Sequence, residues 1–207
     1  MITSQRRKSK MSGHVARWIV IVLLSCVLIW SYYGNNAWSL EKVVSQTLAA
    51  AEQPDVRLEE RISSGHGVSF VWLVDREHAL MHHFFVSRPF GVLWENRSGV
   101  FGESLDNATL FNFKWHRTII GKYMHHAYIG QANDPSISSV QLTWQDGREE
   151  KTVLKDGVFV AVRAFHKDIE EPSRHVNVQI KAYDDQGGLL YELNDDKRVV
   201  RQVEPTS

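Results

Sequence analysis

The chain has 207 residues, of which 43% are apolar, with 24 basic and 24 acidic side chains and a formal net charge of zero. This length and apolar content suffice for one or two small domains with their own cores. The 13 glycines and 5 prolines are too few for a collagen-like or low-complexity chain. The balanced charge argues against a nucleic-acid partner. The only cysteine, Cys26, cannot form an internal disulfide.

The N-terminal end combines a basic tail with an apolar segment. Residues 1–17 carry five basic side chains and no acidic one, which leaves 19 basic against 24 acidic residues in the rest of the chain. Counted from Val15 to Tyr33, the apolar stretch has 19 residues, and a helix needs about 20 to cross the hydrocarbon core. The positive-inside rule then predicts a cytoplasmic tail at 1–17, a transmembrane helix at 18–33 and an extracytoplasmic remainder.

Two processing alternatives stay open for this segment. Ala37 and Ser39 are small residues at the spacing that a signal peptidase recognises. The segment from Leu23 to Cys26 is similar to a bacterial lipobox, although four apolar residues follow the cysteine, where a lipoprotein usually becomes polar. A retained helix, a cleaved signal and a lipid anchor therefore compete as explanations.

Residues 34–116 are expected to form an extracytoplasmic helix-plus-sheet unit. Apolar residues recur at three- and four-residue steps between Ala37 and Gln53, which predicts an amphipathic helix. Asn36 or Ser39 can cap its free amides, and Pro54 should end it. The period then changes to that of strands, which predicts an antiparallel sheet covering the helix. The expected strands are 56–61, 67–74, 78–87 and 90–101.

Residues 117–195 are expected to form a small, immunoglobulin-like β-sandwich, with residues 196–207 as a polar tail. Alternating apolar residues predict sheets that are buried on one face. The polar segment 104–107 is the best candidate linker, but 110–115 could pair with either side, and the boundary is placed near residue 116. The whole chain is thus predicted to be mainly β, of the α+β type.

The strands of this second half are read from the same period-two pattern. The expected strands are 122–130, 138–144, 149–154, 158–165, 175–183 and 189–193. Three dipeptides tolerant of positive φ predict tight hairpins between them. These dipeptides are Asp146-Gly147, Asp156-Gly157 and Gly187-Gly188.

This organisation resembles that of uncharacterised membrane-anchored extracytoplasmic proteins of Bacillus-like Firmicutes. The resemblance rests on the order of tail, membrane helix, amphipathic helix and strands, and on short segments within residues 36–193. Those segments are Gly67-Val68-Ser69-Phe70-Val71, Phe90-Gly91-Val92-Leu93-Trp94, Tyr128-Ile129-Gly130, Ser139-Val140-Gln141-Leu142 and Ala182-Tyr183-Asp184-Asp185-Gln186-Gly187. The resemblance implies export and a β-rich fold, and it implies no catalytic residue.

Ten histidines are the most unusual feature of the composition, and six of them fall between residues 78 and 126. Imidazole binds zinc, copper or nickel, so a metal site is one hypothesis, with His78, His82 and His125 as candidates. Adjacent residues of a strand face opposite sides, so neither His82 with His83 nor His125 with His126 can share one ion. Histidines on exposed strands or loops are therefore the favoured interpretation.

No complete catalytic set is found, and neither a cofactor nor an enzymatic activity is expected. Ser39 and Lys42 have the spacing of the nucleophile and base of penicillin-recognising enzymes, but the partner motifs are missing, which favours a helix N-cap role for Ser39. The sequence predicts a membrane-anchored binding or accessory module of the cell envelope, with an envelope protein or cell-wall component as partner. An envelope metal-binding protein that uses the histidines is the alternative.

Overall fold

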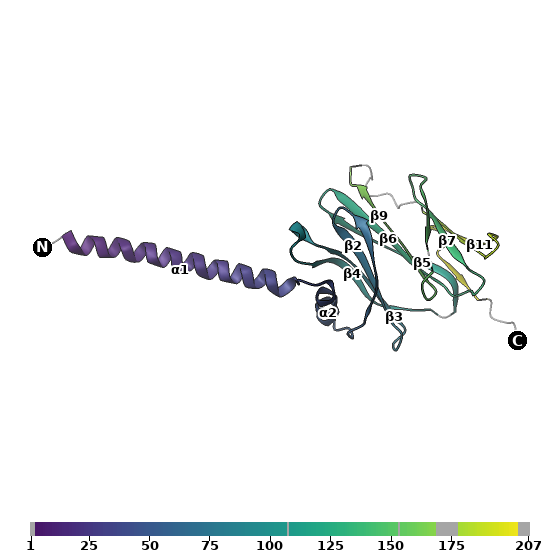
Figure 1. Ribbon diagram of the computed structural model, residues 1–207, viewed down its shortest axis with the longest axis horizontal. Coiled ribbons are helices and arrows are strands. Elements are labelled where there is room, and N and C mark those ends of the chain that lie inside the picture. Colours follow the sequence, from purple (N-terminus) through teal and green to yellow (C-terminus); the bar gives the residue numbers. More distant parts are fainter. Residues whose placement is uncertain (1–2, 107, 153, 169–177, 203–207) are drawn as a thin grey trace.

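The computed structural model describes residues 3–106, 108–152, 154–168 and 178–202 (Figure 1). Within these residues the chain forms two α-helices, one short 3₁₀ helix and three antiparallel sheets of four strands each. The predicted mainly β fold class is confirmed. The immunoglobulin-like character of the second half stays a prediction.

The first helix, α1 (Thr3–Asn35), projects from the β domain as a single rod (Figure 1). Its window Gly13–Tyr33 has a mean hydropathy of 2.0, and none of that window is buried inside the protein. Trp18 and Trp30, near the two ends of this window, are 66% and 83% exposed. The helix is therefore long and apolar enough to span a membrane, and its apolar surface is covered by no other part of the described chain.

The second helix, α2 (Leu40–Ala50), is the predicted amphipathic helix. The backbone N–H of Lys42 donates to the Ser39 hydroxyl at 3.2 Å, so Ser39 is the N-cap, and Glu41 lies in the first turn. Four apolar side chains of α2 pack on one face of the first sheet, as the spacing required. The members of this cluster are Leu40, Val43, Val44 and Leu48 from the helix and Val71, Leu73, Phe84 and Val86 from the sheet.

The first sheet has the strand order β1-β2-β3-β4, in which each strand pairs with the next one along the chain. Its strands are β1 (Leu58–Gly65), β2 (Val68–Asp75), β3 (Leu80–Ser87) and β4 (Glu95–Ser104). The predicted meander is confirmed. The fourth strand begins later than expected, because Pro89 starts the 3₁₀ helix η1 (Pro89–Gly91).

The other two sheets interleave along the sequence. The middle sheet has the order β12-β5-β6-β9, and the third sheet has the order β11-β10-β7-β8. The middle strands are β5 (Thr109–Ile120), β6 (Tyr123–Ala132), β9 (Val158–His166) and β12 (Val199–Arg201). The third-sheet strands are β7 (Ser139–Thr143), β8 (Glu149–Thr152), β10 (Gln179–Tyr183) and β11 (Leu189–Leu193).

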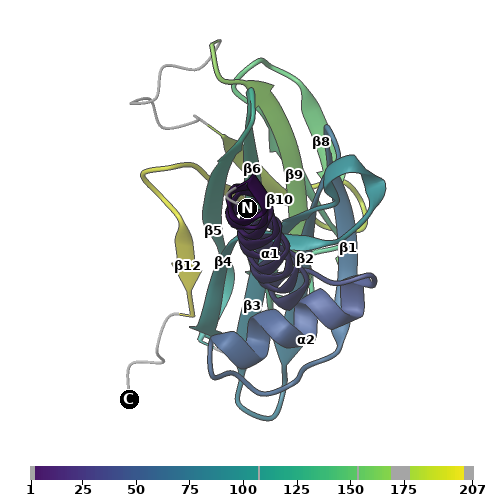
Figure 2. The ribbon, with the colours of Figure 1, turned by 90° about the vertical axis from the view of Figure 1, so that its left-hand side faces the viewer.

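The elements stack as four layers: α2, the first sheet, the middle sheet and the third sheet (Figures 1 and 2). The middle sheet is buried on both faces. In β6, Ile129 packs toward the first sheet and Tyr128 toward the third. In β9, Val162 packs toward the first sheet and Phe159 toward the third. One-sided burial was therefore wrong for 158–162, whereas β10 does alternate between buried and half-buried residues.

Two expected boundaries differ from the structure. Residue 116 lies inside β5, which pairs with β6 and β12, so the chain changes sheets between Ser104 and Thr109 instead. The expected polar tail contains β12, because Val200 packs against the core between the middle and third sheets. Short strands without alternation, such as Val199–Arg201, carry too little periodic signal to be found from sequence.

The expected tight turns are present. Gly147 and Gly187 have φ of 79° and 83° and lie in the hairpins β7–β8 and β10–β11. Asp156 and Gly157 have φ of 52° and 75°. Their turn joins β8 of the third sheet to β9 of the middle sheet, so it links two layers instead of two paired strands.

Candidate functional site

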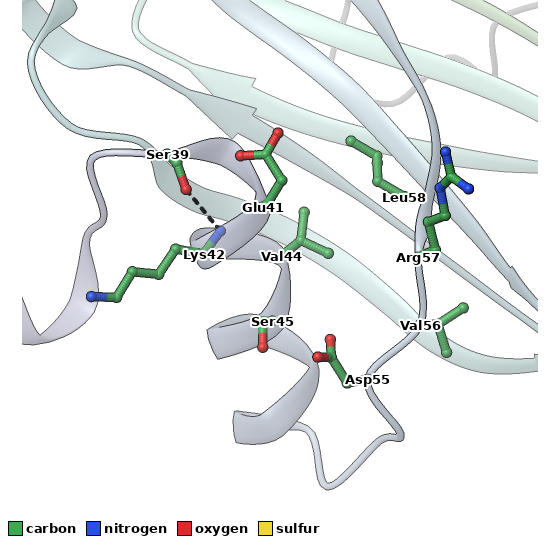
Figure 3. Close-up of a pocket in the computed structure, with 9 residues that line it drawn as sticks. All are labelled: Ser39, Glu41, Lys42, Val44, Ser45, Asp55, Val56, Arg57 and Leu58. Carbon is green, nitrogen blue, oxygen red and sulfur yellow. Dashed lines mark hydrogen bonds between the residues drawn. The ribbon is translucent and has the colours of Figure 1, made fainter.

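An open groove of about 860 Å³ lies between α2 and the segment that leads into β1 (Figure 3). Val44, Val56 and Leu58 supply its apolar part. Its polar lining residues are Ser39, Glu41, Lys42, Ser45, Asp55 and Arg57. Because α2 follows α1 after only four residues, this groove lies at the end of the domain nearest α1.

The groove is lined by hydroxyl groups, charged side chains and apolar side chains. The Ser39 hydroxyl accepts the N–H of Lys42, and Figure 3 shows the Lys42 side chain extending away from Ser39. The lysine amine is thus not placed to take a proton from the hydroxyl, and the N-cap prediction for Ser39 is confirmed. The two acidic and two basic side chains of the lining balance in formal charge.

The histidines occupy different positions from those expected. Five are buried with exposed fractions between 0 and 8%: His82, His83, His116, His125 and His126. The prediction that the histidines lie on exposed strands or loops was wrong for these five, because their strands are covered by neighbouring layers, and it is confirmed for His78, which lies in an exposed turn. The opposite-face argument holds for β6, where one imidazole faces the first sheet and its neighbour stacks on Trp115, with ring centroids 6.0 Å apart.

Three of these imidazoles lie between the first and middle sheets. His125 Nδ1 is 2.8 Å from the Ser64 hydroxyl, and His116 Nε2 is 2.9 Å from the Ser98 hydroxyl. The rings of His83 and His116 are 5.2 Å apart. Each pair joins a strand of one sheet to a strand of the other, so these polar contacts hold the layers together.

Burial determines the protonation state of the three imidazoles between the first and middle sheets. Loss of hydration lowers the pKa of His83 to about 3, with smaller contributions from His116 and Lys114. The same cause lowers the pKa values of His116 and His125 to about 4. All three imidazoles are therefore neutral at pH 7. The hydroxyl–imidazole pairs resemble parts of a nucleophilic site, but their imidazoles are buried between the first and middle sheets, where the pairs connect strands of the two layers.

The metal candidates do not come together. His78 lies in the turn before β3, where its Nδ1 is 2.8 Å from Asp75 Oδ2 and its side chain is 53% exposed. His82 accepts the backbone N–H of Gly102 at 3.2 Å, and His125 pairs with Ser64 as described. Among the described residues, no three His, Cys, Asp or Glu side chains form a group that could hold a metal ion. The metal-binding alternative therefore has no ligand set in this part of the chain.

A further group of polar and aromatic side chains was not found from sequence. Trp94 lies on the outer face of the first sheet, and the guanidinium carbons of Arg61 and Arg88 are 5.4 and 5.8 Å from its ring centroid. The backbone of Trp94 bridges to that of Ala37, directly after α1. Nothing in the sequence indicates that Arg61 and Arg88 lie against the same tryptophan.

Comparison with known proteins gives no relative: no protein-family model, no curated protein and no solved structure matches this chain.

Proposed function

We propose that this protein is a binding or accessory module anchored by α1 in the cell membrane, with its β domain on the extracytoplasmic side. One observation carries the proposal. Only residues 34–36 separate Tyr33, the last residue of the apolar window, from Ala37, which is 2% exposed and hydrogen-bonded to Trp94. Because three residues reach at most about 10 Å, an inserted α1 would hold the domain against the membrane surface.

The charge distribution supports this orientation. The five basic residues within 1–17 precede the apolar window, whereas Lys42 is the only basic residue between positions 34 and 56. Basic residues close to a membrane helix are retained on the cytoplasmic side. The N-terminal segment is accordingly assigned to the cytoplasm and the β domain to the outside.

The structure of the junction supports a retained helix over a cleaved signal. Ala37 is buried and pairs with Trp94, and Ser39 caps α2. Cleavage after Ser39 would remove both contacts from the folded domain. Residues with these structural roles are poor candidates for a discarded segment.

Binding is favoured over catalysis by the positions of the reactive side chains. The imidazoles of His125 and His116, which pair with Ser64 and Ser98, are buried between the first and middle sheets. The open surface near α1 instead offers the polar groove of Figure 3. A protein of the envelope or a cell-wall component is the partner class that an extracytoplasmic domain would meet there.

Topology is tested by labelling single cysteines in intact cells with a membrane-impermeant thiol reagent. Cys26→Ser removes the native thiol, and Gln186→Cys or Ser9→Cys adds one in the β10–β11 turn or in the basic tail. We expect Gln186→Cys to react in intact cells and Ser9→Cys to react only after lysis. The reverse pattern would overturn the orientation, and extraction of the full chain by alkaline carbonate would overturn the anchor.

A further inference from the structure

The cluster of Arg61, Trp94 and Arg88 is built on the side of the domain from which α1 emerges. Arg61 comes from β1, and Arg88 follows β3 directly. Their guanidinium groups lie over the Trp94 ring at 5.4 and 5.8 Å, and Arg88 Nε also donates to the Val92 carbonyl at 3.3 Å. Both arginines are exposed. Stacking on an aromatic ring holds a guanidinium in place while the N–H groups at its edge remain available.

Neither arginine is neutralised within the described part of the chain, where no carboxylate forms an ion pair with Arg61 or Arg88. By contrast, the exposed Arg76 pairs with Asp156 at 2.7 Å, and the half-buried Arg163 pairs with Asp146 at 2.6 Å. An unpaired guanidinium fork matches the geometry of a phosphate group and binds it through charge-assisted hydrogen bonds.

The position of this cluster relative to α1 identifies where the phosphate would come from. Trp94 is hydrogen-bonded to Ala37, and Tyr33 ends the apolar window only four residues earlier. Each headgroup layer of a bilayer is roughly 5–8 Å thick, so a tether of about 10 Å keeps Trp94 within or just above it. Trp38 is 63% exposed and lies 6.2 Å from the Tyr33 ring, as expected for aromatic residues at a membrane interface.

We propose that Arg61 and Arg88 bind the phosphodiester groups of phospholipid headgroups and thereby seat the first sheet and α2 on the bilayer. This inference rests on the proposed anchor, because the tether fixes the height of the cluster above the membrane. The domain is then held flat against the lipid by two contacts in addition to α1. The middle and third sheets face away from the membrane, where a partner can reach them (Figure 1).

The test measures how close the loop after η1 lies to the headgroups. The full chain with Cys26→Ser and Val92→Cys, labelled with a fluorophore, is reconstituted in phosphatidylcholine–phosphatidylglycerol nanodiscs that contain lipids spin-labelled on the headgroup. Val92 is 41% exposed and accepts the Arg88 hydrogen bond through its carbonyl, so its side chain can carry the probe next to the cluster. We expect strong quenching at position 92 and none for a probe at Gln186→Cys in the outermost hairpin.

The arginine variants make the test specific. The double variant Arg61→Gln, Arg88→Gln removes two cationic contacts. Each contact changes the equilibrium constant between the seated and the lifted domain by a factor of roughly 5 at an anionic membrane surface. The equilibrium should therefore shift about 30-fold toward the lifted domain, and quenching at position 92 should fall. Arg148→Gln in the β7–β8 turn is the matched control and should leave quenching unchanged. Circular dichroism and thermal melting establish that each variant is folded. If the double variant has a lower melting temperature than the parent, the quenching measurement is made on the two single variants instead.

The outcomes separate this inference from the proposed function. A chain that carbonate extracts from the membrane would refute the anchor itself. A chain that stays in the membrane but shows no quenching at position 92, or equal quenching in the double variant, would refute lipid binding by Arg61 and Arg88 and leave the anchor intact. Equal losses in the double variant and in Arg148→Gln would show a general charge effect, which also overturns the inference.

Discussion

Ala37 and Trp94 exchange both of their backbone hydrogen bonds, with N···O distances of 3.0 and 2.7 Å. The bridge ties the chain that leaves α1 to the segment that enters β4, two residues before the N-cap of α2. The helix and the β domain are therefore joined through paired backbone instead of a free linker.

The N-cap of α2 gives the most local prediction. Replacing Ser39 by alanine removes the acceptor for the N–H of Lys42 and should lower the free energy of unfolding by about 1 kcal/mol. Ser39→Asp keeps an acceptor and adds a negative charge near the helix N-terminus, so it should retain the stability of the parent. Thermal melts of the two variants check this, and equal destabilisation by both would contradict a capping role.

The core between the middle and third sheets gives a larger expected effect. Ile180 is fully buried there, so Ile180→Ala should leave a cavity and cost roughly 2–5 kcal/mol of unfolding free energy. Gln179, its neighbour on β10, is half-buried and faces the other side, where it contacts Glu192. Gln179→Ala should therefore change stability by less than about 1 kcal/mol. Denaturant titrations that show equal losses would contradict the assigned faces of β10.

Periodicity explains which parts of the fold were predictable. The stripe of α2 was found because the helix buries one face, which a period of 3.6 marks. The strands of the first sheet were found from their aromatic and β-branched residues, although β2 and β3 are buried on both faces. The strands of the middle sheet were located from the sequence, but their burial on both faces was not predicted. Val158–Val162 has apolar residues on both faces because β9 lies between two sheets, and one chain segment does not reveal how many layers cover it.

The contacts of the candidate site residues were predictable only where both partners are close in the sequence. Ser39 could be assigned as a cap, since the contact spans three residues. The partners of His125 and Trp94 could not be found, because Ser64 and Arg61 reach them from other strands. Contacts between strands depend on sheet order and register, which sequence spacing does not contain. The burial of the histidines was missed for this reason.

Close packing at Gly130 predicts a strong effect from a single methyl group. A Cβ added at this position of β6 would lie 2.1 Å from the Asn112 carbonyl oxygen and 2.4 Å from the fully buried ring of Phe159. Gly130→Ala must therefore displace β5 or the ring and should cost about 1–3 kcal/mol or more. Gly13→Ala in α1, where no atom lies within 4 Å, is the matched control. Comparable melting temperatures for parent and Gly130→Ala would contradict this packing.

The buried histidines predict that the β domain loses stability in mild acid. In the folded protein the pKa values of His116 and His125 are about 4 and that of His83 about 3, whereas an unfolded imidazole has a pKa near 6.5. Below pH 6.5 the unfolded chain binds protons that the folded chain does not. Stability is thus fully present above pH 6.5 and falls as the pH decreases toward 4, by on the order of 2 kcal/mol per histidine at pH 5. Unfolding titrations at pH 7, 6 and 5 measure the slope.

Two substitutions separate this effect from general acid denaturation. His125→Gln keeps a hydrogen-bonding group opposite Ser64 but cannot take up the proton, so stability should fall less steeply between pH 7 and 5 than in the parent. His78 is expected to act in the opposite direction, because its hydrogen bond to Asp75 raises its pKa, and its contribution is present below pH 6.5 and lost as the pH rises. His78→Gln should therefore steepen the fall in acid. Identical slopes for the parent, His125→Gln and His78→Gln would show that the acid sensitivity arises elsewhere than at these imidazoles.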